Sequence, residues 1–426
     1  MMAKERVERA PKVLPGQPNG PAVVITRRAA DRLCGGHLWV YRSDTESLIP
    51  REDETDLTAG ALVTVVDGRG IPLGTGLYSD SSQIAVRMVS GEPGIARETY
   101  LDDVRHRLIE AFSLRDNLAP LSSEDDSCRL VFAEADALPG IVVDRYGELV
   151  ILQLLAQGTA QPDLREVLVT AIRQHFGSSV AAIVERPDPR IRELEQLAAP
   201  STEPLWASDG VKLTTVFTIN GLRFHYDASA GQKTGAFLDQ RLNYAAAARH
   251  AHGKALDICT YQGGFALHLA QRCDHVTGVD VSRAALEVAD RNLLLNPSLK
   301  ADVDWIEADA FDLLRDYDAS NQRFDTIVLD PPAFAKSKRA LEGALRGYKE
   351  MNLRALKMLQ PGGMLITCSC SHHMGREEFV SVVAAAASDS RRRVQVLETR
   401  GAAPDHPEVL TLPETAYLKC LICRVS

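Results

Sequence analysis

The 426-residue sequence lacks several features that would point to a membrane or secreted protein. It has no apolar run long enough to span a bilayer. Its charged start, residues 1–12, lacks the apolar segment of a secretory signal. The eight cysteines are scattered without regular spacing, which fits free thiols in a reducing compartment. We therefore expect a cytoplasmic protein that makes no membrane contact.

A zinc-site pattern and an excess of positive charge are also missing. The C-x-x-C pair of Cys420 and Cys423 stands alone, and a zinc site needs more ligands than two, so no metal is expected. Lys and Arg number 48 against 57 Asp and Glu, a net charge of -9. This balance mildly disfavours a nucleic-acid partner because phosphate contacts need basic side chains. It does not exclude one, since local patches matter more than the sum.

The pattern of the chain predicts an arm followed by three units. Residues 1–21, rich in Pro, Gly and charge, are expected to form a disordered arm. Short apolar runs with frequent turns predict a small β-barrel over residues 22–95. Strand-like runs around a helix predict an α+β middle domain over residues 96–215. Residues 216–426 alternate strand and helix at βαβ spacing, which predicts an α/β fold with a mostly parallel sheet.

A strand, a glycine turn and a helix follow one another in residues 255–265. Asp257 precedes the turn, and Gly263 lets the backbone approach a ligand closely. The next strand ends in Asp280, where an acid can hold ribose hydroxyls. The dinucleotide fingerprint G-x-G-x-x-G is absent, and Asp257 would repel a pyrophosphate. The pattern therefore suits a cationic or amino-acid-bearing nucleoside better than a dinucleotide.

A possible catalytic pair lies on two later strands. Residues 324–330 predict a buried strand that ends in an Asp-Pro-Pro turn at Asp330. Residues 364–373 predict the neighbouring strand, with Cys368 and Cys370 on one face. Ligands bind beyond the carboxyl ends of such strands, so a thiol there is a candidate nucleophile, with a packed core cysteine as the alternative. Cys370 lies roughly 6–7 Å nearer that end than Cys368, which favours it as the nucleophile.

A thiol and an acid over one cleft indicate chemistry on a pyrimidine base. Cytosine C5 is a poor nucleophile, but a thiolate that adds to C6 turns the ring into an enamine, and C5 can then attack a methyl donor. A free thiol titrates near ~8.5, so the site must favour the thiolate. Asp330 would orient the base through its N3 and amine edge.

The ordered acids resemble those of class I S-adenosylmethionine-dependent methyltransferases, which have a Rossmann-like fold. The resemblance implies S-adenosyl-L-methionine as cofactor, with Asp257 and Gly263 near its methionine end. It places Asp280 at the ribose and Asp309, which follows the next strand, near the adenine amine. It implies further cofactor contacts from Phe237, Tyr261 and Asp330.

Other motifs resemble RNA-modifying enzymes. Residues 37–41 and 76–87 look like a PUA domain, a small β-barrel found in such enzymes. Residues 232–241 resemble the Q-K-T-G-x-x-L-D-Q-R segment of one RNA methyltransferase family. With the motifs at 346–349, 405–407 and 417–419, the chain resembles the bacterial large-subunit ribosomal RNA cytosine-5 methyltransferase family, which implies Cys370 as the nucleophile.

That family implies RNA, from 23S ribosomal RNA, as partner, and a homodimer is left open. Substrate contacts are expected from Lys233 and Arg241 at RNA phosphate, from Trp39 by base stacking, and from Phe334. The alternative for the basic side chains is a solvated surface. The alternative for Trp39 is a core or rim aromatic.

Two other functions stay open. One is an RNA methyltransferase with a different target atom, such as a guanine nitrogen, which needs neither cysteine. In amino-directed methyltransferases an aromatic directly follows the Asp-Pro-Pro turn, whereas here Ala333 follows it and Phe334 comes one residue later, which weakens this reading. The other is a catalytically weak RNA-binding ribosome-assembly factor, against which the intact acids argue.

Overall fold

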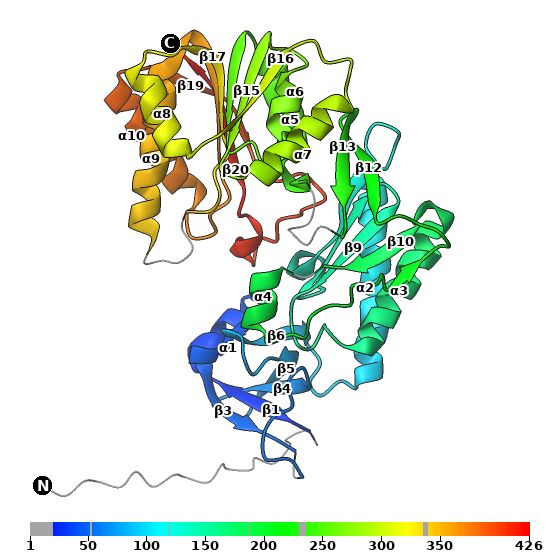
Figure 1. The fold of residues 1–426 in the computed structure, drawn as a ribbon. Coiled ribbons are helices and arrows are strands. Elements are labelled where there is room, and N and C mark those ends of the chain that lie inside the picture. The colour runs from blue at the N-terminus through cyan, green and yellow to red at the C-terminus, as the bar shows by residue number, and fades with distance from the viewer. Residues whose placement is uncertain (1–19, 52, 119, 187, 230–235, 335–339) are drawn as a thin grey trace, which may run out of the picture. The chain divides into compact units, whose positions relative to one another are not determined.

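The structure is a computed structural model that describes residues 20–51, 53–118, 120–186, 188–229, 236–334 and 340–426. Nearly all of the predicted arm, and Lys233, lie outside these residues. The chain forms two compact units, and Figure 1 shows its helices and strands. In the part that the structure describes, no helix is both long and apolar enough to cross a membrane.

The first unit contains Met1–Arg105, Leu155–Val167 and Pro189–Ala199. Its six strands form a sheet in the order β2-β6-β5-β4-β1-β3, in which β1 and β4 pair in parallel and the other neighbours are antiparallel. These elements are β1 (Ala22–Ile25), α1 (Arg27–Cys34), β2 (Trp39–Tyr41), β3 (Thr45–Ile49), β4 (Leu62–Asp67), β5 (Pro72–Tyr78) and β6 (Ile84–Ser90). Buried aliphatic side chains from this sheet and α1 form one core, as the predicted pattern of short strands requires.

A segment far along the chain completes this unit. Helix α4 (Pro189–Leu194) leads to Glu195, a buried side chain. Its carboxylate lies 3.0 Å from the guanidinium of Arg87 and accepts a 2.8 Å hydrogen bond from the Ser79 hydroxyl. A buried charge needs such partners. The predicted middle domain, 96–215, is therefore divided between the two compact units.

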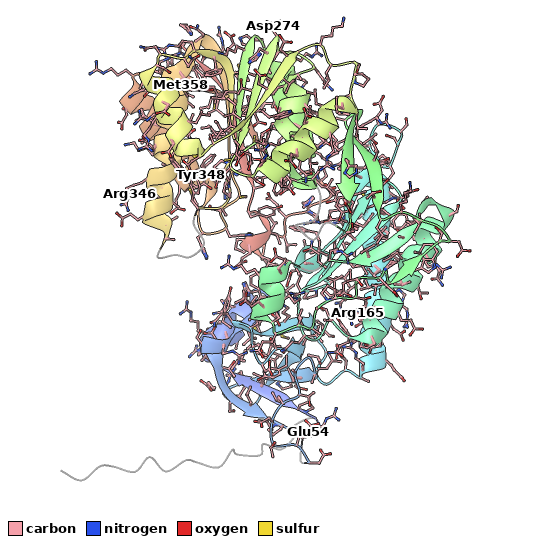
Figure 2. All side chains as sticks on the ribbon, viewed as in Figure 1. Glu54, Arg165, Asp274, Arg346, Tyr348 and Met358 are labelled. Atoms are coloured by element: carbon pink, nitrogen blue, oxygen red, sulfur yellow. The ribbon has the colours of Figure 1, made fainter. Side chains whose placement is uncertain are left out.

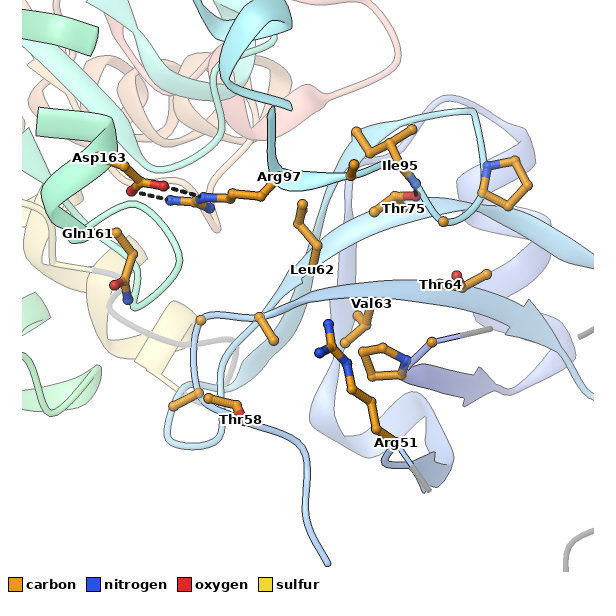
Figure 3. Close-up of a pocket in the computed structure, with 18 of the residues that line it drawn as sticks. Arg51, Thr58, Leu62, Val63, Thr64, Thr75, Ile95, Arg97, Gln161 and Asp163 are labelled. Atoms are coloured by element: carbon orange, nitrogen blue, oxygen red, sulfur yellow. Dashed lines mark hydrogen bonds and ion pairs between the residues drawn. The ribbon is translucent and has the colours of Figure 1, made fainter. Parts of the chain in front are cut away.

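A pocket of about 760 Å³ lies within the first unit (Figure 3). On one side Arg97 binds Asp163 through two 2.8 Å hydrogen bonds, and Arg51 and Thr58 line another part. No buried side-chain polar atom of the described lining lacks a hydrogen-bond partner. We assign no ligand to this pocket.

The second unit contains His106–Leu154, Leu168–Asp188 and Pro200–Ser426. Its smaller sheet has the order β11-β10-β9-β8-β7 and packs with the C-terminal parts of α2 and α3, whose Phe112 and Phe176 rings lie 5.2 Å apart. The elements are α2 (Arg97–Leu118), β7 (Ser127–Phe132), β8 (Ile141–Tyr146), β9 (Leu149–Leu154), α3 (Pro162–Phe176), β10 (Ala182–Glu185) and β11 (Trp206–Ala207).

A hairpin of β12 (Thr214–Ile219) and β13 (Leu222–Asp227) links this sheet to the larger one. The Ser127 hydroxyl donates to the carbonyl of Thr218 at 2.9 Å, and the Tyr146 and Phe217 rings lie 5.0 Å apart. One hydrophobic core runs from β8 and β9 through the hairpin to the larger sheet. The two sheets of this unit are therefore held by continuous packing.

The larger sheet has seven strands in the order β16-β15-β14-β17-β18-β20-β19. Only β20 runs antiparallel to its neighbours, so β19 has the same direction as β18. The strands are β14 (Lys254–Ile258), β15 (His275–Asp280), β16 (Asp302–Glu307), β17 (Phe324–Leu329), β18 (Leu359–Ser369), β19 (Val394–Arg400) and β20 (Lys419–Val425). The predicted α/β fold with a mostly parallel sheet is confirmed.

Helices cover both faces of this sheet (Figure 1). The helices α5, α6 and α7 lie on one face, and α8, α9 and α10 lie on the other. They are α5 (Arg241–His250), α6 (Gly264–Leu269), α7 (Arg283–Leu294), α8 (Ala310–Ala319), α9 (Leu341–Met358) and α10 (Arg376–Ser390). Because both faces are covered, β17 and the last six residues of β18 are almost wholly buried, as their apolar sequences predict.

Candidate active site

Asp257 lies near the carboxyl end of β14 and is fully buried. Its Oδ2 accepts hydrogen bonds from the Thr260 hydroxyl at 2.5 Å and from the backbone N–H of Ala266 at 2.9 Å. Its Oδ1 is buried and has no partner among the described residues. Burial raises the pKa of Asp257 to about 7, against the opposing effect of these two hydrogen bonds. An unpaired buried oxygen of this kind suits a ligand that donates a hydrogen bond.

The loop after β14 is held in an unusual backbone conformation. Cys259, Tyr261 and Gly263 all have left-handed φ angles, of 65°, 52° and 84°. For the two non-glycine residues this costs roughly 1–2 kcal/mol each, and such strain clusters at functional sites. A Cβ at Gly263 would lie 3.1 Å from the Trp305 ring, so the glycine allows a close approach there.

Acids follow the next two strands. The carboxylate of Asp280, the last residue of β15, accepts backbone hydrogen bonds from Tyr261 and Ser282, both at 2.9 Å. Asp280 thus holds the strained loop against the second strand. Asp309, an exposed residue after β16, caps α8 by accepting from the backbone N–H groups of Phe311 and Asp312 at 2.9 and 3.1 Å.

Two aromatic side chains stand beside this loop. The rings of Phe237 and Tyr261 lie 5.1 Å apart, and Phe237 is 44% exposed. Both line a small pocket with groups from β13, α5, the loop after β14, α6 and the end of β17. Asp330 belongs to the same lining. The pocket therefore brings together three of the predicted cofactor residues, Phe237, Tyr261 and Asp330, with both sequence neighbours of Gly263.

Asp330 directly follows β17, the strand beside β14. Its Oδ2 accepts a 3.0 Å hydrogen bond from the side-chain amide of Gln240. Burial, with the nearby carboxylates of Asp239 and Asp257, raises the pKa of Asp330 to about 8, and the Gln240 hydrogen bond lowers it in part. Much of this side chain is therefore protonated at neutral pH.

Cys370 directly follows β18, the strand beside β17. Its thiol donates to the carbonyl oxygen of Pro331, with Sγ 3.9 Å from that oxygen. The thiol and the Asp-Pro-Pro turn thus meet at one edge of the sheet. Burial, followed by the charges of Asp330 and Asp239, raises the pKa of Cys370 to about 12, so the site without its ligands favours the thiol, contrary to the expectation of a stabilised thiolate. Cys368, two residues earlier, is fully buried in the core. It therefore matches the alternative interpretation, a packed core cysteine.

Family comparison matches residues 150–424 to S-adenosylmethionine-dependent methyltransferases and residues 23–91 to a PUA-like domain. The chain belongs to the S-adenosylmethionine-dependent methyltransferases. S-adenosyl-L-methionine is therefore its cofactor, as the sequence predicts, and the N-terminal sheet is PUA-like.

Individual relatives support this assignment because they are similar to this chain over nearly its whole length. Ribosomal RNA large subunit methyltransferase I from Erwinia tasmaniensis is 37% identical over 95% of this chain and 99% of its own, and that of Klebsiella pneumoniae is 36% identical over 95% and 98%. The crystal structure of SMU.776 in complex with SAH has the same fold, with a TM-score of 0.77, 18% identity and coverage of 95% and 99%.

The methyltransferase also holds the Cys370 segment by two residues to which the sequence assigned no role. The hydroxyl of Tyr348, on α9 (labelled in Figure 2), lies 3.1 Å from the hydroxyls of both Ser369 and Ser371. Lys419, buried at the start of β20, donates to the carbonyls of Ser371, Met374 and Tyr417 at 2.7, 2.9 and 2.7 Å. In the sequence, the motifs at 346–349 and 417–419 pointed to the segments that contain these two residues.

Lys419 supplies the positive charge near the thiol of the methyltransferase. Burial lowers the pKa of its ammonium to about 8, and its charge lowers the pKa of Cys370 against the larger effect of burial.

The described residues contain no group of three or more His, Cys, Asp or Glu side chains that could hold a metal ion.

The predicted substrate residues lie in different places. Arg241 is only 5% exposed, and its Nε lies 3.5 Å from the carboxylate of buried Asp405. This corrects the expectation of a phosphate contact, because the guanidinium points into the protein and is already paired. Trp39 lies in the PUA-like unit, half-buried, with its ring 5.7 Å from His37 and 6.4 Å from Tyr41.

Phe334 packs against the hydrophobic core of the methyltransferase. Its half-buried ring packs 4.7 Å from Tyr348 and 5.8 Å from Phe311. The ring is thus already packed against two others, and a substrate contact by Phe334 stays a prediction.

Proposed function

We propose that this methyltransferase forms 5-methylcytosine in large-subunit ribosomal RNA through a covalent adduct between Cys370 and C6 of the base. The observation that carries the proposal is the position of the Cys370 thiol. Its Sγ lies 3.9 Å from the carbonyl oxygen of Pro331, the residue after Asp330. The full-length similarity to relatives named for large-subunit ribosomal RNA supports the substrate. The packing of Phe334 argues against an amino-directed enzyme, which needs an aromatic free to stack on its base.

The residues around the strained loop fit the cofactor. The unpaired Oδ1 of Asp257 would receive the methionine end near Gly263, and Asp280 would bind the ribose. Phe237 and Tyr261 would flank the cofactor, and Asp309 would lie near the adenine amine. S-adenosylmethionine, when bound, supplies an electrophilic methyl group.

The protein's own groups then carry the reaction on the base. The Cys370 thiol loses its proton, and the thiolate forms a bond to C6 while the C5=C6 electron pair moves to C5, which takes the methyl group. Loss of the C5 proton restores the double bond and expels the thiolate. One proton is released overall. Asp330 orients the base through its N3 and amine edge, and Lys419 offsets the charge of the thiolate.

The test is to map 5-methylcytosine in ribosomal RNA from cells with and without the gene, and to repeat the transfer with purified protein and unmodified RNA. We expect one cytosine of the large subunit to lose its methyl group in the absence of the protein. A methyl group on a guanine nitrogen, or a protein that binds RNA and transfers nothing, would contradict the proposal.

The role of Asp257 predicts pH-dependent cofactor binding. We expect the affinity for S-adenosylmethionine to rise as the pH is raised through about 7, since only the ionised carboxylate pairs with the cofactor's amino cation. Asp257→Asn should weaken binding about 10- to 100-fold, because a hydrogen bond to a charged group contributes roughly 1.5–3 kcal/mol. Calorimetric titration between pH 6 and 8 measures both effects.

The matched control is Asp274→Asn. Asp274 directly precedes β15, at the opposite edge of the sheet from Asp257, and its side chain is exposed (Figure 2). Its replacement should leave the affinity and its pH dependence unchanged. Equal affinities of the wild-type protein and Asp257→Asn at pH 8 would remove Asp257 from the cofactor site.

A further inference from the structure

A chain of hydrogen bonds runs from the end of β19 through two buried amides to Asp330. The Nε of Arg400 donates to Oδ1 of Asn243 at 2.8 Å, and the Nδ2 of Asn243 donates to Oε1 of Gln240 at 2.7 Å. The Nε2 of Gln240 then donates to Oδ2 of Asp330 at 3.0 Å. Asn243 and Gln240 are 1% and 2% exposed, so water does not compete for the hydrogen bond between them.

The direction of this chain is fixed at its start. A guanidinium can only donate hydrogen bonds, so Arg400 requires the oxygen of Asn243 on its side. The amide nitrogen of Asn243 then faces Gln240 and also donates to the carbonyl of Gly401 at 3.0 Å. Gln240 must turn its own oxygen to Asn243, which leaves its nitrogen for Asp330. Each amide is therefore set by the one before it.

Arg400 is itself held in place. Its Nη1 binds the carboxylate of Glu398 at 2.7 Å, and its Nη2 donates to the carbonyl of Leu242 at 3.3 Å. The other carboxylate oxygen of Glu398 lies 2.7 Å from His250 and 3.5 Å from Arg249. Because β19 runs in the same direction as β17, its end lies at the sheet edge where Asp330 stands.

We propose that Arg400, Asn243 and Gln240 are positioning residues for Asp330, which keep its Oδ2 as a hydrogen-bond acceptor and so place its proton on Oδ1. This inference rests on the proposed function, because it assigns the Oδ1 proton to N3 of the target cytosine. Oδ1 makes no hydrogen bond within the described ranges. A donor at N3 withdraws electron density from the ring and favours attack of the Cys370 thiolate at C6.

The ionisation of Asp330 depends on the groups that surround it. They come from the segment before α5, from α5, from β14 and its loop, and from β18 and its end: Asp239, Tyr244, Asp257, Cys259, Cys368 and Cys370. Burial and the two neighbouring aspartates hold the pKa of Asp330 at about 8. The acid form is thus present at neutral pH. The hydrogen-bond relay of Arg400, Asn243 and Gln240 determines which oxygen of Asp330 carries the proton.

The substitution Asn243→Asp reverses the relay with almost no change in shape. An ionised Asp at this position still accepts from Arg400 but cannot donate to Gln240, so the Gln240 amide turns over and presents its oxygen to Asp330. Asp330 can then bond only by donating from Oδ2, away from the base. We expect kcat to fall about 100-fold, the scale of general acid catalysis, with little change in KM for RNA. The alkaline limb of the pH–rate profile, expected near pH 8, should move to higher pH.

Three further variants keep the test decisive. Asn296→Asp makes the same exchange at a buried asparagine that binds the backbone of Arg223 outside the relay, and should not move the alkaline limb. If Asn243→Asp does not fold, Arg400→Gln, which can face Asn243 either way, should lower kcat. Arg400→Lys, which can only donate, should restore most of it.

A second measurement does not depend on methyl transfer. The infrared band of the protonated Asp330 carboxyl, identified by its loss in Asp330→Asn, should persist to higher pH in Asn243→Asp than in the wild-type protein. If the wild-type protein makes no 5-methylcytosine, the proposed function fails, while the infrared titration still tests the relay. If it does make 5-methylcytosine, and neither the band nor the pH–rate profile differs in Asn243→Asp, the relay is overturned.

Discussion

Cys370→Ala is expected to lower methyl transfer to RNA by about a thousandfold or more, because loss of the nucleophile removes the covalent route altogether. The effect should appear in kcat, while cofactor affinity stays close to that of the wild-type protein. A single-turnover assay with radiolabelled cofactor and large-subunit RNA measures it. In RNA that carries 5-fluorocytosine, C5 has no proton to lose, so the wild-type protein should remain covalently attached and Cys370→Ala should not.

Cys368→Ala is the matched control, since it removes a thiol from the same strand face two residues earlier. Cys368 is fully buried in the hydrophobic core, so its loss should cost about 1–2 kcal/mol of stability and leave the turnover rate nearly unchanged. Methyl transfer by Cys370→Ala at the wild-type rate would contradict the covalent mechanism. It would favour a target atom that needs no cysteine.

Much of this site follows from the sequence because parallel strands end at the same edge of a sheet. Asp257, Asp330 and Cys370 come from β14, β17 and β18, which are consecutive in the sheet. Each was marked by an apolar run that stops at a polar or reactive residue. The direction of the strands then brought residues more than a hundred positions apart to the same edge of the sheet. Local patterns of this kind are strong where a buried strand meets a turn.

Pairings between distant charges could not be predicted in this way. Arg241 belongs to a segment that reads as a polar entry to a helix, and nothing in it indicates that its partner is Asp405, 164 positions later. The same holds for Glu195. It pairs with Arg87 in the first compact unit, although residue 185, ten positions earlier, belongs to the second. Opposite charges are abundant in this chain, and only packing decides which of them are buried together.

Aromatic residues show the same limit. Phe334 stands one position after the place where a stacking residue is expected, and the sequence alone left its role open. Its ring packs against Tyr348 and Phe311 because α8 and α9 both lie over the end of β17. The arrangement of these helices, rather than the spacing of the motif, decides which rings Phe334 packs against.

Asp405→Ala is expected to destabilise the second compact unit by about 3–5 kcal/mol, the cost of removing one partner from a buried ionic network. The Asp405 carboxylate accepts from the backbone N–H of Arg129 at 3.0 Å and lies 3.5 Å from Arg241 and 3.2 Å from His406. Its own carbonyl accepts from Arg115, which is paired with buried Asp136. Calorimetric scans at pH 7 should show a lower Tm for the variant.

The pH dependence separates the charge of Asp405 from its packing. Burial alone would raise the pKa of Asp405, but His406, Arg241 and the N–H of Arg129 hold it well below its usual range. A lowered pKa stabilises the fold above the unfolded value of ~3.9, and this contribution is lost as the pH falls further. The gap in Tm between the wild-type protein and Asp405→Ala should therefore shrink in acid, and Asp405→Asn should lie between them at pH 7. The control Glu342→Ala removes an exposed helical pair with Arg346 and should have little effect. An equally small effect of Asp405→Ala would mean that packing alone joins the two sheets.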